Sequence, residues 1–300
     1  MRKIFLATTA IVALTSVSAM AADVTISGGA NLIFSNDDKD IPGAGGSTGS
    51  ASEMKSEADV NINFSATSDS GITTTMSAGF DEAGRTDDAN ASISGDFGTI
   101  KFVADLGGQT DDSVINGFDE AHNKAGEGTA GVSNGLATQA GESISYTLPS
   151  IVDGMTIAVA HTNEDTTESF GYGIAYDAGI AKVQYATISN NTTDIKSANI
   201  STTVSGISLG YEQNKTETAT TESESTLYGV SYTMDAVTLA YEAGSTKNKA
   251  GATTDDYSQM AVAYSVATGV SLIITNSEVD DQTSANADVE EMEIQLKLSF

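Results

Sequence analysis

The sequence predicts an all-β protein: a closed, 16-stranded antiparallel barrel that crosses a membrane. Three features of the chain predict this fold: strict apolar–polar alternation at its end, a leader for export at its start, and unequal connections between its strands. Successive side chains of a strand point to opposite faces, so an alternating strand has one apolar and one polar side. A closed barrel can turn these sides to lipid and to water without leaving a free edge.

The C-terminal segment 290–300 shows the alternation most clearly. One face carries Met292, Ile294, Leu296, Leu298 and Phe300, and the other carries Glu291, Glu293, Gln295, Lys297 and Ser299. Lipid outside the barrel and water inside it account for both faces. The alternative for this segment alone is a half-buried strand of a soluble β-sandwich.

Residues 1–21 are predicted to be a signal peptide. A basic start is followed by an apolar run over 4–17 and by small residues that favour cleavage before Ala22. The run is too short for a membrane-spanning helix, although an uncleaved anchor is the alternative. Residues 22–300 are then one barrel domain, and no disulfide stabilises this exported chain because it contains no cysteine.

Composition narrows the possible partners. The chain has 41 acidic and 13 basic residues and a net charge of −28, which argues against nucleic acid and anionic surfaces. Such a charge is also typical of disordered chains. Two prolines in the whole chain and the period-two apolar runs favour strands instead. No stretch after Ala22 approaches the ~20 apolar residues of a membrane helix.

Alternation predicts sixteen strands, with ends uncertain by a few residues. They lie near 23–35, 55–68, 72–80, 89–95, 99–105, 142–149, 154–162, 170–176, 181–185, 198–204, 207–211, 228–232, 237–241, 260–264, 270–274 and 290–300. Short turns are predicted at 69–71, 96–98, 150–153, 177–179, 205–206, 234–236 and 267–269. Long polar loops are predicted at 36–54, 81–88, 106–141, 163–169, 189–196, 212–225, 244–256 and 276–287. This rhythm is typical of an outer-membrane barrel, whereas a β-solenoid would have equal repeats.

Several segments resemble the general porins of Gram-negative bacteria, closest to the alphaproteobacterial type. The turn 93–101 is similar to the one before their constriction loop, 142–150 to their returning strand, and 23–29 with Phe300 to their first and last strands. The resemblance implies an outer-membrane homotrimer whose loop 106–141 folds into the lumen, and passive diffusion of small hydrophilic solutes. It also implies that Phe300 is part of the signal read by the outer-membrane assembly machinery. Two departures are the single arginine after the leader, Arg85, and the absence of tryptophan.

The loop 106–141 holds the candidate constriction residues. Its acidic side chains are Asp111, Asp112, Asp119, Glu120 and Glu127, and the opposing wall is assigned to Lys55, Arg85 and Lys101. Carboxylates around a narrow aqueous path concentrate cations and repel anions, so a cation-preferring pore is predicted. The alternative is that these charges are merely solvated.

Acidic pairs raise the question of calcium, which prefers oxygen ligands. Asp37, Asp38 and Asp40 are the candidate ligands, but their spacing matches no defined calcium loop, and solvated loop acids remain the simpler interpretation. Divalent ions that bridge surface carboxylates to neighbouring lipopolysaccharide are a further hypothesis. Otherwise no cofactor is expected.

The histidines are the residues that bear on possible catalysis. His122 and His161 are the only histidines and no nucleophile motif accompanies them, so no enzymatic activity is expected.

All tyrosines fall between Tyr146 and Tyr264, which predicts that the later strands face lipid and that the small residues of the first strands face sister barrels. Outward-pointing tyrosines favour an unselective pore. The alternatives are a sugar- or ion-selective channel of the same fold, or an exported acidic β-protein for adhesion or surface coating.

Overall fold

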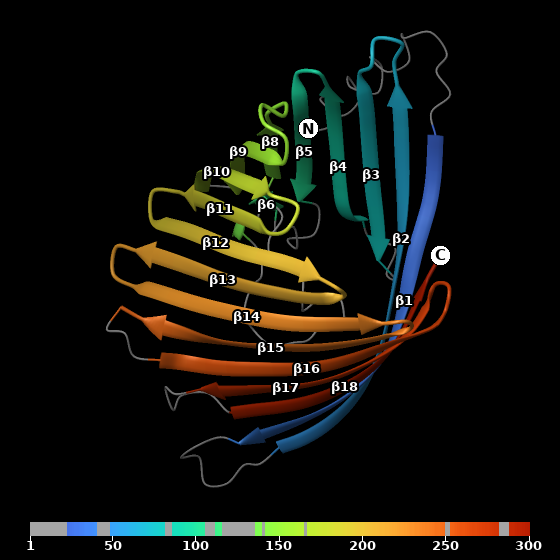
Figure 1. The fold of residues 1–300 in the computed structure, drawn as a ribbon, viewed down its shortest axis with the longest axis vertical. Helices are drawn as coiled ribbons and strands as arrows, with labels where there is room; N and C mark the ends of the chain where they lie inside the picture. The colour runs from blue at the N-terminus through green and yellow to red at the C-terminus, as the bar shows by residue number, and fades with distance from the viewer. Residues whose placement is uncertain are drawn as a thin grey trace.

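The computed structural model describes residues 23–40, 49–81, 86–105, 112–115, 136–139, 142–164, 167–249, 253–281 and 288–300. Its strands are β1 (Asp23–Asp40), β2 (Gly49–Thr67), β3 (Thr73–Asp81), β4 (Thr86–Gly95), β5 (Gly98–Asp105), β6 (Asp112–Ile115), β7 (Leu136–Gln139), β8 (Glu142–Thr147), β9 (Met155–Glu164), β10 (Thr167–Asp177), β11 (Lys182–Ser189), β12 (Thr193–Val204), β13 (Ile207–Thr218), β14 (Glu222–Met234), β15 (Val237–Asn248), β16 (Thr253–Ala267), β17 (Val270–Asp281) and β18 (Asp288–Ser299). Figure 1 shows them as a strongly curved wall.

Strands β1–β5 and β8–β18 close a ring of sixteen antiparallel strands, which confirms the predicted fold class. The ring closes where β1 pairs with β18, with Leu32 opposite Leu296 and Ser35 opposite Glu293. On its other side β1 pairs with β2. Among the described residues, no helix is long and apolar enough to cross a membrane.

The wall has an apolar outer face and a polar inner face. In β10, Phe170 and Tyr172 are 57% and 49% exposed, whereas Ser169, on the opposite face, is 2% exposed. In β18, Leu298 is exposed and Gln295 is buried. Large apolar side chains stay exposed around the ring because lipid, not a protein core, covers them. The soluble-sandwich interpretation of β18 is therefore wrong.

Most of the predicted long loops are wrong in extent. At least half of each predicted loop is strand in the ranges 36–54, 81–88, 163–169, 189–196, 212–225, 244–256 and 276–287. Short connections at 190–192 and 219–221 join β11 to β12 and β13 to β14. Above the lipid both faces of a hairpin meet water, so apolar alternation ends although the backbone ladder continues. Alternation therefore predicts only the part of each strand that meets lipid. We call the side of the barrel at which the predicted long loops lie the loop end. The opposite side, with the short turns such as 177–179 and 205–206, is the turn end.

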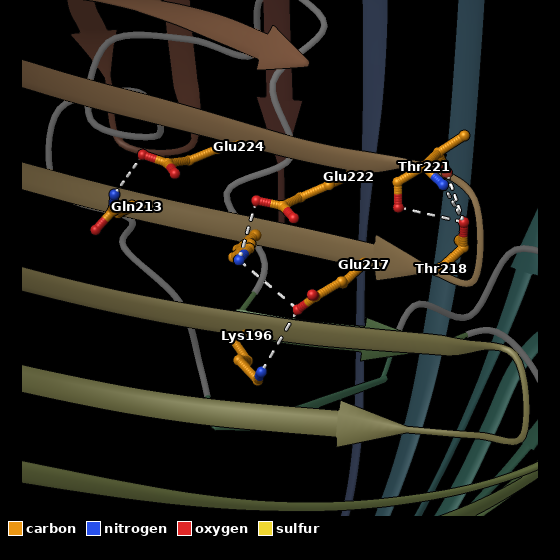
Figure 2. Close-up of polar contacts among 8 residues, drawn as sticks. Lys196, Gln213, Glu217, Thr218, Thr221, Glu222 and Glu224 are labelled. Atoms are coloured by element: carbon orange, nitrogen blue, oxygen red, sulfur yellow. Dashed lines mark hydrogen bonds and ion pairs between the residues drawn. The ribbon is translucent and has the colours of Figure 1, made fainter. Parts of the chain in front are cut away.

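A group of charged side chains, joined by one glutamine, lies at the loop end of β12–β14 (Figure 2). We call it the charged rim; it consists of Lys196, Gln213, Lys215, Glu217, Glu222 and Glu224. Lys215 Nζ lies 3.1 Å from Glu222 Oε1 and 3.7 Å from Glu217 Oε2, and Lys196 Nζ lies 3.8 Å from the same Glu217 oxygen. These side chains share the outward face with Tyr211 and Tyr228, which are opposite each other. The charged rim thus begins where the apolar belt ends.

The loop 106–141 contributes a hairpin inside the ring. β6 pairs with β7, with Asp112 opposite Gln139, and this hairpin contacts β9–β12 (Figure 1). The inward positions that form the local core of that wall are small or apolar: Ala158, Ala160, Ala175, Ala186 and Ile188. Small residues allow the hairpin to lie close to the wall. The predicted inward fold is thereby confirmed for β6 and β7, and the rest of the loop 106–141 lies outside the described residues.

Candidate functional site: the lumen of the barrel

The inner wall of the barrel is acidic. On β2, β13, β15 and β18 the inward positions carry seven carboxylates and two lysines: Glu53, Glu57, Asp59, Glu212, Glu242, Glu291 and Glu293, against Lys55 and Lys297. Their inward placement follows from the pairing, because the alternate positions of the same strands form the exposed apolar belt. The lumen can therefore attract cations over much of its wall.

Two of these carboxylates lie deep in the wall. Glu212 is 0% exposed and Glu242 is 3% exposed. Asn214 donates a hydrogen bond of 2.6 Å from Nδ2 to Glu212 Oε1, and Tyr257 donates one of 2.8 Å from Oη to Glu242 Oε1. Hydrogen bonds of this kind stabilise a buried carboxylate.

The inward position of Tyr257 contradicts the expectation that all tyrosines point outward. Tyr257 is 6% exposed and lies opposite Gly244 of β15, whose missing side chain leaves room for the ring. A Cβ atom at Gly244 would lie 2.5 Å from Tyr257 Cε1. The acidic segment before Tyr257 lacks alternation, so the sequence did not indicate which way this side chain points.

Two buried amides accompany the carboxylates. Asn199 lies opposite Glu212, and Gln259 lies opposite Glu242. Both amides are inward and at most 5% exposed. Within the described part of the chain, neither Asn199 Oδ1 nor Gln259 Oε1 has a hydrogen-bond partner. Sequence reasoning missed both, because their neighbours depend on strand register.

The structure places three of the predicted constriction residues and does not describe the other five. Lys55 and Lys101 occupy inward positions on β2 and β5, Lys55 exposed and Lys101 half-buried. Asp112 begins β6, which places its backbone inside the ring. The other candidates lie outside the described residues: Arg85, Asp111, Asp119, Glu120 and Glu127. Their roles at the constriction stay predictions.

The candidate calcium ligands lie on a strand rather than in a loop. Asp37, Asp38 and Asp40 are part of β1, opposite Glu291, Glu290 and Asp288 of β18. Adjacent strand positions alternate between faces, so the positions of Asp37 and Asp38 do not share one. Across the described ranges, no group of three or more acidic, histidine or cysteine side chains is arranged to hold a metal ion. Calcium at these three positions stays a prediction.

His161 lies on the lipid-facing side of β9, on the same face as Ile157 and Val159. Its Nδ1 is 3.1 Å from the backbone oxygen of Ser169, and its ring borders an outer groove of about 350 Å³ together with Ile144, Tyr146 and Phe170. His122 lies outside the described residues.

Phe300 completes the ring at the turn end. Its backbone N–H donates to Gly28 O at 3.0 Å, and Gly28 N–H donates to Phe300 O at 3.2 Å. Its ring lies against Gly28, where a Cβ atom would lie 2.9 Å from Phe300 Cζ. The side chain is nevertheless 76% exposed, as expected for an aromatic residue at the edge of the lipid belt.

A closed barrel with an apolar belt, an acidic lumen and a hairpin folded inward defines an outer-membrane channel protein. The sequence matches the Gram-negative porin family over residues 7–287, and the chain belongs to that family. It is thus a multi-pass barrel of the outer membrane of a Gram-negative bacterium, as predicted. No curated protein matches the sequence.

Solved structures share the fold at low identity. An anion-selective porin from Comamonas acidovorans has a TM-score of 0.70 and 14% identity, covering 93% of this chain and 100% of that chain. A mutant of the Rh. blastica porin has a TM-score of 0.65 and 14% identity, covering 93% of this chain and 100% of that chain. Salmonella typhi OmpF in complex with daunomycin has a TM-score of 0.69 and 11% identity, covering 92% of this chain and 97% of that chain. At such identities the likeness concerns the fold.

Proposed function

We propose that this porin is a water-filled channel for the passive diffusion of small hydrophilic solutes and ions, that it prefers cations, and that it catalyses no reaction. The observation that carries the proposal is the excess of inward carboxylates over inward lysines on β2, β13, β15 and β18. Charges that line a narrow path between low-dielectric walls focus the field and enrich counter-ions.

Two other selectivities are less well supported. The Comamonas relative is described as anion-selective, but at 14% identity its lumen charges do not transfer to this chain. A sugar-selective channel needs a row of aromatic side chains along its lumen. Tyr257 is the only tyrosine at an inward position among the described residues, so such a row has no counterpart there.

Planar-bilayer recordings test the proposal directly. In a potassium chloride gradient, the reversal potential of the purified full-length protein should have the sign of a cation-preferring pore. An anion-preferring reversal potential would refute the selectivity, and the absence of conductance from folded barrels would refute the channel itself.

We further propose three partners for the outer surface. The outward positions of β1–β3 include the small residues Gly28, Ala30, Ala58, Ala66 and Ala78, which would allow sister barrels to approach closely in a homotrimer. The charged rim lies above the outer tyrosines, at the level of lipid headgroups, where lysines and divalent-bridged carboxylates could bind lipopolysaccharide phosphates. The strand that ends at Phe300 would be read by the outer-membrane assembly machinery.

A further inference from the structure

Glu242 and Gln259 are neighbouring residues of the inner wall. They are directly opposite each other on β15 and β16, and their side chains share the inward face. Both residues are 3% exposed. Ser277 of β17 lies opposite Gln259 on the same face and is 6% exposed. A carboxylate, an amide and a hydroxyl residue therefore occupy neighbouring inward positions on three strands.

The buried amide oxygen is the observation that points to a ligand. Gln259 Oε1 has no hydrogen-bond partner within the described part of the chain, although burying such an acceptor costs about 1–3 kcal/mol. Its direct neighbour is a carboxylate, which also offers oxygen acceptors rather than donors. Two adjacent acceptors of this kind are stabilised by a positive charge between them.

The geometry suits a hard cation. Directly opposite residues of antiparallel strands have Cβ atoms about 5 Å apart, and calcium binds oxygen at about 2.3–2.6 Å. A calcium-sized ion can therefore contact an oxygen atom from each side chain.

The hydrogen bond of Tyr257 holds the carboxyl group of Glu242 in place. The Tyr257 hydroxyl donates to Glu242 Oε1 at 2.8 Å, which fixes the orientation of that side chain. Gly244 leaves the space in which the ring lies, so the donor is held in place.

We propose that Glu242 and Gln259 form a binding site for a small hard cation of the calcium type in the lumen wall, with Ser277 as an additional oxygen donor and Tyr257 as a positioning residue. The site is separate from Asp37, Asp38 and Asp40. It does not depend on ion flow through the barrel.

Terbium luminescence tests this site, because terbium replaces calcium and emits when a nearby aromatic ring transfers energy to it. The chain contains no tryptophan, so tyrosine is the sensitiser, and Tyr257 contacts the proposed ligand Glu242. We expect the refolded full-length protein in detergent to give tyrosine-sensitised terbium emission that calcium displaces.

Variants separate the proposed ligands from the remaining charges. Glu242→Gln should abolish the emission, and Gln259→Leu should weaken apparent affinity on the order of tenfold. Tyr257→Phe should lose the emission while calorimetry still detects calcium binding. Asp153→Asn, at an exposed position in the turn before β9, is the matched control and should bind as the unmodified protein does. Each variant is first shown to fold by its heat-dependent mobility in gel electrophoresis.

Three results would overturn the proposal. The first is folded, unmodified protein that gives no displaceable emission. The second is Glu242→Gln protein that binds terbium as tightly as the unmodified protein. The third is an infrared band of a protonated carboxyl group that disappears in Glu242→Gln, because a proton would then occupy the place of the cation. None of these measurements depends on ion conductance. A negative result would therefore disprove cation binding at this site without bearing on the proposed channel.

Discussion

Tyr257 and Glu242 form a hydrogen bond of 2.8 Å in the inner wall of the barrel, between two strands whose outer faces meet lipid. The bond joins an aromatic hydroxyl to a carboxylate that is 3% exposed. It exists because β15 and β16 pair with Gly244 opposite Tyr257 and Glu242 opposite Gln259. A hydrogen bond to a buried charge contributes more than one at the surface, so this pair should affect the stability of the wall.

Replacing Tyr257 by Phe should destabilise the barrel by about 1–3 kcal/mol, because Glu242 loses a charge-assisted hydrogen bond while remaining buried. Urea titration of the protein in lipid vesicles measures the change. Tyr264→Phe is the matched control, since Tyr264 lies on the same strand, points outward and is 47% exposed. Equal midpoints for the two variants would contradict the expected role of the Tyr257 hydroxyl.

Gly244→Ala tests the space that holds the Tyr257 ring. The new Cβ atom would lie 2.5 Å from Tyr257 Cε1 and 2.4 Å from the backbone oxygen of Thr226, so the ring and the neighbouring strand must shift. Overpacking of this kind costs about 1–3 kcal/mol. The same urea titration measures the loss, and combining the substitution with Tyr257→Ala should recover part of it. No recovery in the double variant would show that the backbone contact alone causes the effect.

The fold was predictable because contact with lipid on one face requires an apolar side chain at every second residue of each strand. In β18, lipid contact requires Met292 and Leu298 to share a face, and this requirement is visible in the sequence itself. The hairpin ends around 190–192 and 219–221 were not predictable, because both faces of those strands meet water and any polar residue is tolerated there.

The deep part of the lumen wall was not predictable for a different reason. Glu242 and Gln259 are distant in the sequence, and only the register of β15 against β16 makes them neighbours. The inward direction of Tyr257 depends on the same register. The sequence predicted acidic side chains in the lumen only from the loop 106–141, and it did not single out the wall carboxylates Glu212 and Glu242.

The lysines at the loop end should contribute to the binding of lipopolysaccharide. We expect protein with Lys196, Lys215 and Lys247 replaced by Gln to retain less lipopolysaccharide when purified from outer membranes, because phosphate loses its cationic partners. Lys182→Gln is the control, since Lys182 faces inward near the turn end. Equal retention by the triple variant and the control would contradict a role for these lysines.

Removal of Phe300 should impair closure of the ring. The deletion eliminates both backbone hydrogen bonds to Gly28 and the ring that lies against it. We expect less heat-modifiable barrel in the membrane fraction, whereas Phe300→Tyr should assemble normally because it keeps the bonds and an aromatic ring. The refolding yield of the purified deletion variant separates lost closure from lost recognition by the assembly machinery. Normal refolding with poor assembly in cells would assign the defect to recognition.

Glu291 and Glu293 provide the sharpest test of the lumen charge, because their strand carries its own control. Both occupy inward positions on β18, whereas the neighbouring Glu290 is exposed and shares the outward face with Met292. A unit charge about 8 Å from a permeating ion in water is worth roughly 0.5 kcal/mol, so neutralising both inward charges should lower the cation-to-anion permeability ratio roughly two- to fivefold. Glu290→Gln should leave that ratio unchanged, because a charge on the outer face acts on the path only through the wall and the solvent. Reversal potentials measured in a salt gradient give the ratio for each variant. If Glu290→Gln alters the ratio as much as the inward double variant does, selectivity is a property of overall charge, and the acidic lumen wall is not its source.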